Sequence, residues 1–399
     1  MATPECPPKA PNGSSETSFV STKAFARVLL AQLAIGFGFS IYFLLPKYLA
    51  TELHADATSI GNVGATGLAA AVATTPLMGT LLDRYGRRLP MAASAALVIA
   101  GSLGMLRVHE IGVALYVLRI VQGVGFGLGF NAAAAYVADI APAGRLGQAM
   151  GLLGAASLLT NALAPALFEA VAVKWGWAPV FSAASATGVL TCFVSFVLPE
   201  PDTSRNVATA LAPSNASGAR LGYASWVTGA AFGTLITFTQ PFALSRGAER
   251  VSTYFIGYTL GALLVRIMLG NFADRVGRLR VARWSLFGYG AVALLTAFLE
   301  PSLLLVLGFG FGLAHSFLYP SLAALVAEGV ASERRGRALA NFNAAFNSGA
   351  GLALLGGGWV ARGAGYPALF ALVGCVTITS VLSLSAPSVN LLAPPESRP

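Results

Sequence analysis

Long apolar stretches alternate with short polar segments over most of the chain. A transmembrane helix needs ~20 consecutive, mostly apolar residues, and twelve stretches in this sequence reach or approach that length. The pattern therefore predicts an all-α membrane protein with 12 transmembrane helices. The expected spans are 25–50, 57–81, 89–106, 111–138, 147–170, 177–198, 223–244, 252–272, 281–299, 302–326, 338–361 and 365–386.

A polar segment rich in Pro, Ser, Asn and Arg separates the sixth expected span from the seventh. We expect 24–198 to form one six-helix bundle, 199–222 a cytoplasmic linker and 223–386 a second bundle. Residues 1–23 lack the short hydrophobic core of a cleaved signal peptide. We interpret 1–23 and 387–399 as disordered cytoplasmic tails.

The composition agrees with a membrane protein and argues against a soluble or a nucleic-acid-binding protein. Of the 399 residues 56% are hydrophobic and 10% charged, which excludes a water-soluble globule. The basic residues lie in short clusters between spans, which is typical of topology signals and not of nucleic-acid binding. Of the 25 Lys and Arg, 17 fall on the side of the termini, so we expect both termini in the cytoplasm. The wide spacing of Cys6, Cys192 and Cys375 indicates no disulfide framework, and we expect no metal or cofactor.

Two charged loops repeat along the chain. The loop 79–88 (GTLLDRYGRR) recurs 191 residues later as 270–279 (GNFADRVGRL), and a second pattern of an acid followed six residues later by Arg recurs with a shift of 189. Two repeats in separate loops predict two similar halves. The residues concerned are Gly79, Asp83, Arg84, Gly86, Arg87 and Arg88 with Gly270, Asp274, Arg275, Gly277 and Arg278, and then Asp139 and Arg145 with Glu328 and Arg334.

The paired Gly-x-x-x-Asp-Arg-x-Gly-Arg loops resemble the signature of the major facilitator superfamily (MFS) of secondary transporters, and the resemblance covers nearly the whole chain. It implies two pseudo-symmetric six-helix bundles around a central cavity that opens alternately to each side. It also implies a multi-pass protein of the plasma (inner) membrane. We expect such a protein to work as a monomer on a small-molecule substrate, with protons as a candidate coupling ion.

The loop chemistry predicts a latch. Gly86 and Gly277 permit a tight turn, and the carboxylates of Asp83 and Asp274 suit the unpaired N–H groups at a helix start. By the family pattern, those starts lie in the opposite half, near Ala338 and Gly147 respectively. We hypothesise that the two loops hold the halves together when the cavity faces outward. The alternative is that the basic residues only fix topology.

Arg119 is the main candidate for coupling or binding, because a charge at mid-membrane costs ~2.5–3.5 kcal/mol on insertion scales. With Gln122 and Gly123 it forms Arg-x-x-Gln-Gly, which is similar to a family motif whose Arg is associated with proton coupling. A structural Arg bonded to backbone carbonyls is the alternative. No Asp or Glu lies deep in a span, so either Arg119 binds an anionic substrate group or protonation involves Asp83 or His315. We interpret Arg266, which lies nearer a helix end, as a snorkelling residue.

Other polar groups within spans are candidates for the cavity lining. His315 can titrate near neutral pH, although a histidine bonded to a nearby hydroxyl is an alternative. On helix five, the motif of family antiporters, Gly-x-x-x-Gly-Pro-x-x-Gly-Gly, keeps only Pro165. The expected substrate or coupling residues are Arg119, Gln122, His315, Asn131, Gln32, Tyr42, Gln240, Asn343 and Asn347, with Asn161 and Asn341 as further polar groups.

These observations favour a secondary transporter that moves a small organic solute by alternating access, with export as the expected direction. A proton-coupled importer of a sugar or organic acid is one alternative, and a non-transporting membrane receptor or scaffold with the same fold is another. An enzyme is not expected, because the chain shows no metal-ligand cluster, no nucleophile near a base and no cofactor loop.

Overall fold

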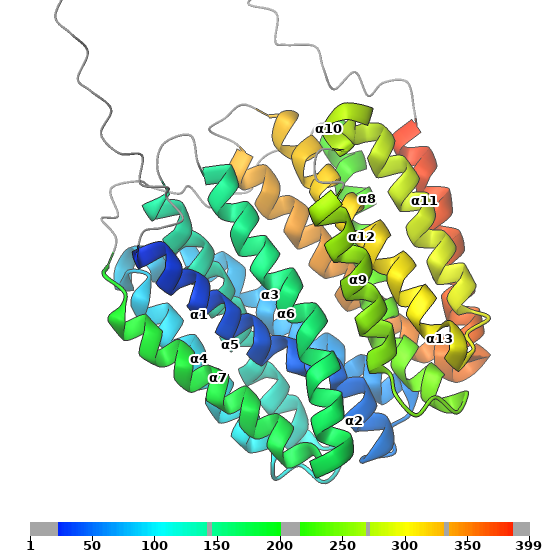
Figure 1. Ribbon diagram of the computed structural model, residues 1–399, viewed down its shortest axis with the longest axis horizontal. Coiled ribbons are helices and arrows are strands. Elements are labelled where there is room, and N and C mark those ends of the chain that lie inside the picture. Colours follow the sequence, from blue (N-terminus) through cyan, green and yellow to red (C-terminus); the bar gives the residue numbers. More distant parts are fainter. Residues whose placement is uncertain (1–22, 142–145, 201–215, 269–271, 331–334, 386–399) are drawn as a thin grey trace, which may run out of the picture.

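The computed structural model describes residues 23–141, 146–200, 216–268, 272–330 and 335–385. Within these ranges the chain is helical and has no strand. The helices form two bundles that lie side by side, one built from the first half of the chain and one from the second (Figure 1). The expected all-α fold with two six-helix halves is confirmed.

The first bundle, which we call the N-half, contains six spans. The first is interrupted: a short 3₁₀ segment, η2, separates α1 from α2, and Pro46 is the second residue of α2. Proline has no N–H to continue an α-helical ladder, which accounts for a break at this point. The elements are α1 (Lys23–Ser40), η2 (Ile41–Leu44), α2 (Leu45–Thr51), α3 (Ala57–Tyr85), α4 (Arg88–Met105), α5 (Val113–Ile140), α6 (Leu146–Trp175) and α7 (Trp177–Val197).

The second bundle, the C-half, also contains six spans. Its last two are both within α13, where Gly365 has non-helical angles (φ 86°, ψ 163°) and so divides the element into two helices. Pro367 lies two residues after Gly365, and proline is well suited to the first turn of a new helix. The elements are α8 (Ala216–Ser245), α9 (Ser252–Met268), α10 (Phe272–Val276), α11 (Arg278–Thr296), η3 (Pro301–Leu303), α12 (Leu304–Glu328) and α13 (Arg335–Ser385).

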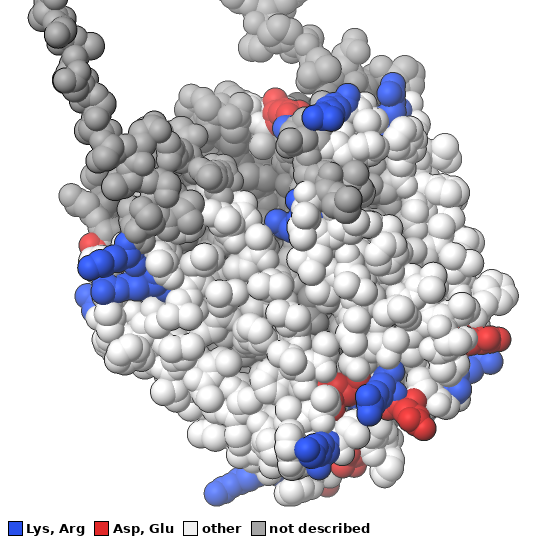
Figure 2. Space-filling model, in the orientation of Figure 1, with Lys and Arg blue, Asp and Glu red and all other residues white. Residues whose placement is uncertain are grey.

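Seven helical segments in the described part of the chain are long and apolar enough to cross a membrane by length and composition. One of the seven, 338–385, contains two helices, and the remaining spans α3, α8, α9 and α11 are shorter or less apolar. Figure 2 shows charged residues mainly toward the two ends of the molecule, with a broad, nearly uncharged band between them. That distribution is the one a bilayer requires.

Helix boundaries differ from the expected spans where helices continue into the polar ends. We expected a linker over 199–222, but α8 already begins at Ala216, and α6 continues to Trp175 beyond the expected 170. Hydrophobicity marks only the part of a helix inside the bilayer, because the backbone hydrogen-bond ladder continues in water. Of the expected tails 1–23 and 387–399, Lys23 already belongs to α1; the rest of both tails, and residues 201–215, lie outside the described ranges.

Glycines allow close helix packing at equivalent places in the two halves. A Cβ on Gly123 or Gly127 of α5 would clash with carbonyl oxygens of α3, and one on Gly308 or Gly312 of α12 would clash with carbonyl oxygens of α9. Small residues permit such approach where burial in lipid gives helices no preference for one another. The glycine runs therefore fix how closely these helices pack in each half.

Candidate functional site

The two halves are bonded to each other at the end of the molecule opposite the repeated loops, which we call the closed end. Glu169 of α6 is buried, and its carboxylate accepts hydrogen bonds from the backbone N–H groups of Val251, at 2.8 Å, and Ser252. Lys47 Nζ lies 2.5 Å from Glu169 Oε1 and 3.4 Å from the carbonyl oxygen of Glu249. A carboxylate of the N-half thus caps the start of α9 in the C-half.

Two further hydrogen bonds join the halves at this end. Gln240 of α8 donates from Nε2 to the carbonyl oxygen of Phe43 at 2.6 Å, and Phe43 belongs to η2 in the interrupted first span. The Thr58 hydroxyl, at the start of α3, donates to the carbonyl oxygen of Gly358 in α13 at 3.4 Å. Gln240 was expected to line the cavity; in the structure it holds the two halves together.

Close backbone packing and one exposed ion pair complete the closed end. A Cβ on Gly61 of α3 would clash with the carbonyl oxygen of Leu354 in α13. Arg362 Nη1 lies 3.2 Å from Asp56 Oδ2, and both side chains are exposed. Asp56 also accepts from the Ser59 N–H as the N-cap of α3, and this bond together with the Arg362 charge lowers the pKa of Asp56.

The opposite end carries the repeated loops, and we call it the loop end. Arg87 Nε lies 2.7 Å from Asp139 Oδ2, with both side chains buried inside the N-half. The equivalent pair in the C-half, Arg278 and Glu328, is partly exposed. Glu200 accepts a hydrogen bond from the Arg87 N–H at 2.5 Å, which caps the start of α4. Each of these contacts stays within one half.

The loop residues take the turn that the sequence predicts. Gly86 and Gly277 have positive φ, 71° and 101°, which L side chains rarely adopt. Asp83, Arg84 and Arg275 are exposed, and Arg88 donates to the carbonyl oxygens of Ser195 and Phe196 in its own half. The structure does not describe the other predicted loop residues: Gly270, Arg145 and Arg334, the side chain of Asp274 and the surroundings of Gly79. The latch between halves therefore stays a prediction.

Arg119 lies in the interior of the N-half, on α5. It is buried, donates from Nη1 to Gln122 Oε1 at 2.7 Å, and its guanidinium lies 5.6 Å from the ring centre of Tyr42. The Tyr42 hydroxyl donates to Ser102 at 2.8 Å, and Gly67 on α3 leaves room for the guanidinium. Among the described residues, Arg119 Nε has no hydrogen-bond partner, and no Asp or Glu forms an ion pair with the Arg119 guanidinium. A buried cation without a counter-ion is expensive in a membrane.

His315 lies in the C-half within a cluster of aromatic rings. It is buried, and its Nδ1 lies 3.4 Å from the Tyr289 hydroxyl. This environment resembles the expected alternative, a histidine beside a hydroxyl group. The surrounding rings belong to Phe232, Tyr258, Tyr289, Phe311, Tyr319 and Phe346.

The remaining amides have separate roles and do not form one cluster. Gln32 of α1 donates to the Ser157 hydroxyl of α6 at 2.9 Å, which joins two helices of the N-half. Asn131 donates to a carbonyl oxygen of its own helix. Asn343, which is exposed on α13, accepts from a tyrosine hydroxyl, and Asn347 is half-buried on the same helix.

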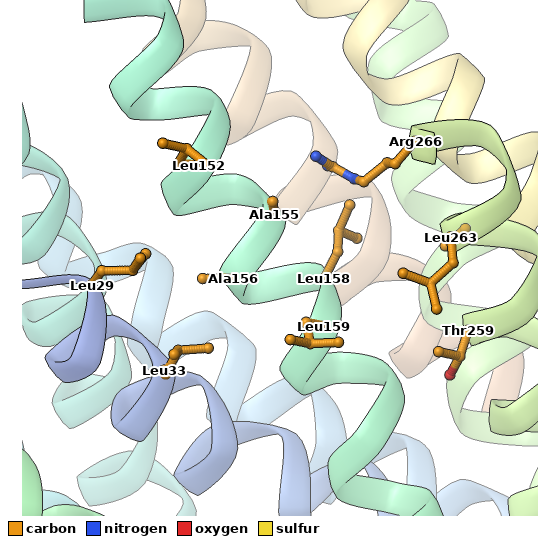
Figure 3. Close-up of a pocket in the computed structure, with 11 residues that line it drawn as sticks. Leu29, Leu33, Leu152, Ala155, Ala156, Leu158, Leu159, Thr259, Leu263 and Arg266 are labelled. Atoms are coloured by element: carbon orange, nitrogen blue, oxygen red, sulfur yellow. The ribbon is translucent and has the colours of Figure 1, made fainter. Parts of the chain in front are cut away.

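A pocket of about 310 Å³ lies between the halves, toward the loop end (Figure 3). Leucines and alanines of α1 and α6 form one side and α9 forms the other, with Thr259 and Arg266 as the polar residues of the lining. From its sequence position, Arg266 was interpreted as a snorkelling residue. The Lys47–Glu169 contact gives no signal in the sequence, because the two residues lie 122 positions apart and neither belongs to a repeat.

A family model described as Major Facilitator Superfamily matches residues 28–255 and 221–399, which together cover most of the chain. The chain belongs to the Major Facilitator Superfamily. It is thus a multi-pass integral membrane protein of a transporter family, which moves small molecules and whose members are not enzymes.

Sequence relatives of this MFS chain include drug-resistance proteins and antiporters. Multidrug resistance protein MdtL of Citrobacter koseri is 26% identical over 178 residues, 44% of each chain. MFS antiporter QDR3 of Candida albicans is 31% identical over 151 residues, 38% of this chain and 21% of the relative. These matches span less than half the length of the curated relatives.

Solved structures show the same MFS architecture at low sequence identity. The nucleoside transporter NupG has a TM-score of 0.76 at 15% identity, with 91% of this chain and 98% of that one covered. The human organic anion transporter MFSD10 has a TM-score of 0.68 at 18% identity, with 90% and 98% covered. At such identities the likeness concerns the fold alone.

Proposed function

We propose that this MFS protein is a secondary transporter that exports a small, largely apolar organic solute by alternating access. The observation that carries this proposal is that, in the described part of the chain, the hydrogen bonds and ion pairs between the halves lie at the closed end, while the pocket lies toward the loop end. With both termini in the cytoplasm, as the basic residues predict, this is an inward-facing state. A solute would enter the pocket from the cytoplasm or the inner leaflet.

The relatives support the direction and the class of solute. MdtL is named for multidrug resistance and QDR3 as an antiporter. The lining of the pocket is mostly leucine and alanine. An apolar lining binds by burial of surface and tolerates different shapes of solute.

Glu169 is the carboxylate best placed to couple protons to this motion. The groups that face it are Lys47 and the N–H groups of Val251 and Ser252. Protonation would remove the charge that attracts all three donors and would weaken the closed end. This role belongs to neither residue that the sequence analysis considered, Asp83 or His315.

The proposal is tested by efflux from proteoliposomes loaded with a panel of dyes and organic solutes, at two imposed pH gradients. We expect pH-dependent efflux of at least one apolar solute, and its loss in Arg119→Ala with membrane insertion unchanged. Normal efflux in Arg119→Ala would remove Arg119 from the mechanism.

The alternatives give different results in the same preparation. Uptake driven by an inward proton gradient would indicate an importer, and flux that ignores pH would indicate a uniporter. A scaffold would show no flux, and single cysteines at the two ends would never exchange accessibility.

A further inference from the structure

The side chain of Arg266 points into the pocket between the halves. It extends from the last turn of α9 toward α6, as Figure 3 shows. The residues that face it across the pocket, Leu152 and Leu159 on α6 and Leu29 and Leu33 on α1, are apolar. A snorkelling Arg turns its head to water at the membrane edge, whereas this one borders a pocket between two bundles.

The Arg266 guanidinium has no counter-charge among the described residues around it. No Asp or Glu belongs to the described lining, and Arg266 forms no ion pair with a described residue. A guanidinium carries five N–H donors and no acceptor. In a mostly apolar pocket, an anionic group is the partner that satisfies several of these donors at once.

The pocket also has the size and composition of a small-molecule site. Its volume of about 310 Å³ lies at the lower end of the range of ~300–1,000 Å³ typical of ligand pockets. Such sites combine an apolar lining with a few polar groups that orient the ligand. Here Arg266 is the orienting charge, and the leucines of α1 and α6 are the apolar surface.

We propose that this pocket binds a small amphipathic organic anion, with its carboxylate, sulfonate or phosphate group on Arg266 and its apolar body against α1 and α6. This inference rests on the proposed function, since it names the class of solute that the transporter moves. Arg266 is then a specificity residue: it selects the charge of the solute, while the leucines leave the shape of its body open. The N-half holds a buried cation as well, Arg119, which pairs with no carboxylate of the described residues.

Charge selection is measured with three probes that share one apolar body: naphthalenesulfonate, naphthalenemethanol and naphthylmethylammonium. Purified full-length protein in a neutral maltoside detergent is titrated with each probe, and thermal shifts give the three dissociation constants. We expect the sulfonate to bind about tenfold more tightly than the alcohol, as a hydrogen-bonded charge provides, and the ammonium to bind more weakly than either.

Matched variants test whether Arg266 causes the preference for the sulfonate. Arg266→Gln should remove the preference for the sulfonate and leave alcohol binding unchanged, and Arg266→Lys should keep part of the preference. Arg246→Gln is the control, because Arg246 lies beyond α8 at the closed end, over the ring of Phe242. A full sulfonate preference in Arg266→Gln, or equal binding of sulfonate and alcohol by the unmodified protein, would overturn the inference.

Two further measurements separate the competing explanations. Native mass spectrometry in mixtures of phosphatidylcholine and phosphatidylglycerol tests whether a lipid occupies the pocket. If phosphatidylglycerol stays bound to the unmodified protein but not to Arg266→Gln, and displaces the sulfonate, the pocket is a lipid site and not a solute site. Flux in neutral proteoliposomes separates the two proposals. Export of neutral or cationic probes alone would refute the anion while leaving the transporter, and anion binding without any flux would refute the transporter while leaving the site.

Discussion

The closed end and the loop end are built on different principles. At the loop end, Arg87 pairs with Asp139 and Arg278 with Glu328, so the same contact occurs twice, once inside each half. At the closed end, Lys47 and Glu169 meet the start of the other half, and no second copy of this contact exists among the described residues. At the loop end a repeated ion pair holds each bundle together, whereas at the closed end unrepeated polar residues hold the two bundles to each other.

The two helix starts at the closed end show the asymmetry in detail. The start of α3 has its own cap, Asp56, and packs closely against Gly358 of α13. The start of α9 follows Val251, whose side chain has no oxygen, and receives its cap from Glu169 of the opposite half. Opening this end would leave α3 capped but α9 uncapped, so we place the control of opening at α9.

Glu169→Gln should open the closed end. The amide has one oxygen for three donors, and Lys47 keeps a buried charge without a partner. Loss of one member of a buried pair costs about 3–5 kcal/mol, so we expect a shift of roughly a hundredfold or more toward the open arrangement. The measurement is the labelling rate of Thr58→Cys by an impermeant maleimide, with Cys6, Cys192 and Cys375 replaced by Ser.

The double variant Glu169→Gln with Lys47→Met is the control for this prediction. It removes both charges, so no unpaired ammonium remains, and labelling should fall part of the way back. Unchanged labelling in the single variant would show that Glu169 does not hold the end closed.

Asp139→Asn should lower the stability of the N-half and leave the closed end shut. It leaves the Arg87 guanidinium buried without a counter-charge, for which we expect a loss of about 3 kcal/mol. Glu328→Gln removes the equivalent but partly exposed pair and should cost less than ~1 kcal/mol. Thermal unfolding and Thr58→Cys labelling check both effects. Faster labelling in Asp139→Asn would mean that the loop-end pair also acts between the halves.

The architecture could be predicted from the sequence because it depends on signals that are local and repeated. The apolar stretches, the two charged loops and the turns at Gly86 and Gly277 can each be recognised within a short stretch of the sequence. Arg119 was found in the same way, since a charge far from both ends of a span is unusual by itself.

The contacts between the halves could not be predicted, because they join residues with no relation in sequence. Lys47 and Glu169 each look like ordinary charges near a membrane surface, and only the fold brings them to the start of α9. Gln240 was recognised as polar but not as a link to Phe43. An Arg at the distance of Arg266 from its helix end can either snorkel or line a pocket. Only the positions of α1 and α6 in the fold show that Arg266 lines a pocket.

Gly61→Ala should open the closed end by a smaller amount than Glu169→Gln. The added methyl group would clash with the carbonyl oxygen of Leu354, so α3 and α13 must separate. Overpacking costs about 1–3 kcal/mol, and we expect roughly tenfold faster labelling of Ser252→Cys. Gly64→Ala is the control one turn away, because its methyl group meets only a leucine side chain, at 3.4 Å. Equal labelling in both variants would argue against backbone packing as part of the closure.

Asp56→Asn and Arg362→Gln should have the smallest effect, because their ion pair is exposed. Asn can still cap α3, so only the charge is lost. We expect the free energy of unfolding, and that of opening the closed end as measured by labelling, each to change by less than ~1 kcal/mol.

The pH dependence of this pair follows from the lowered pKa of Asp56. Hydrogen bonds from Ser59 and then the charge of Arg362 lower that pKa below its ordinary 3.8, so the folded protein favours the carboxylate. The contribution to stability is therefore complete above that ordinary value and is lost as the pH falls through the lowered one. Unfolding followed from pH 8 to pH 3 should show the unmodified protein and Asp56→Asn converging only at the acidic limit, and high salt should reduce their difference. If Asp56→Asn instead opened the closed end as far as Glu169→Gln does, exposed charge rather than the borrowed cap of α9 would control the opening.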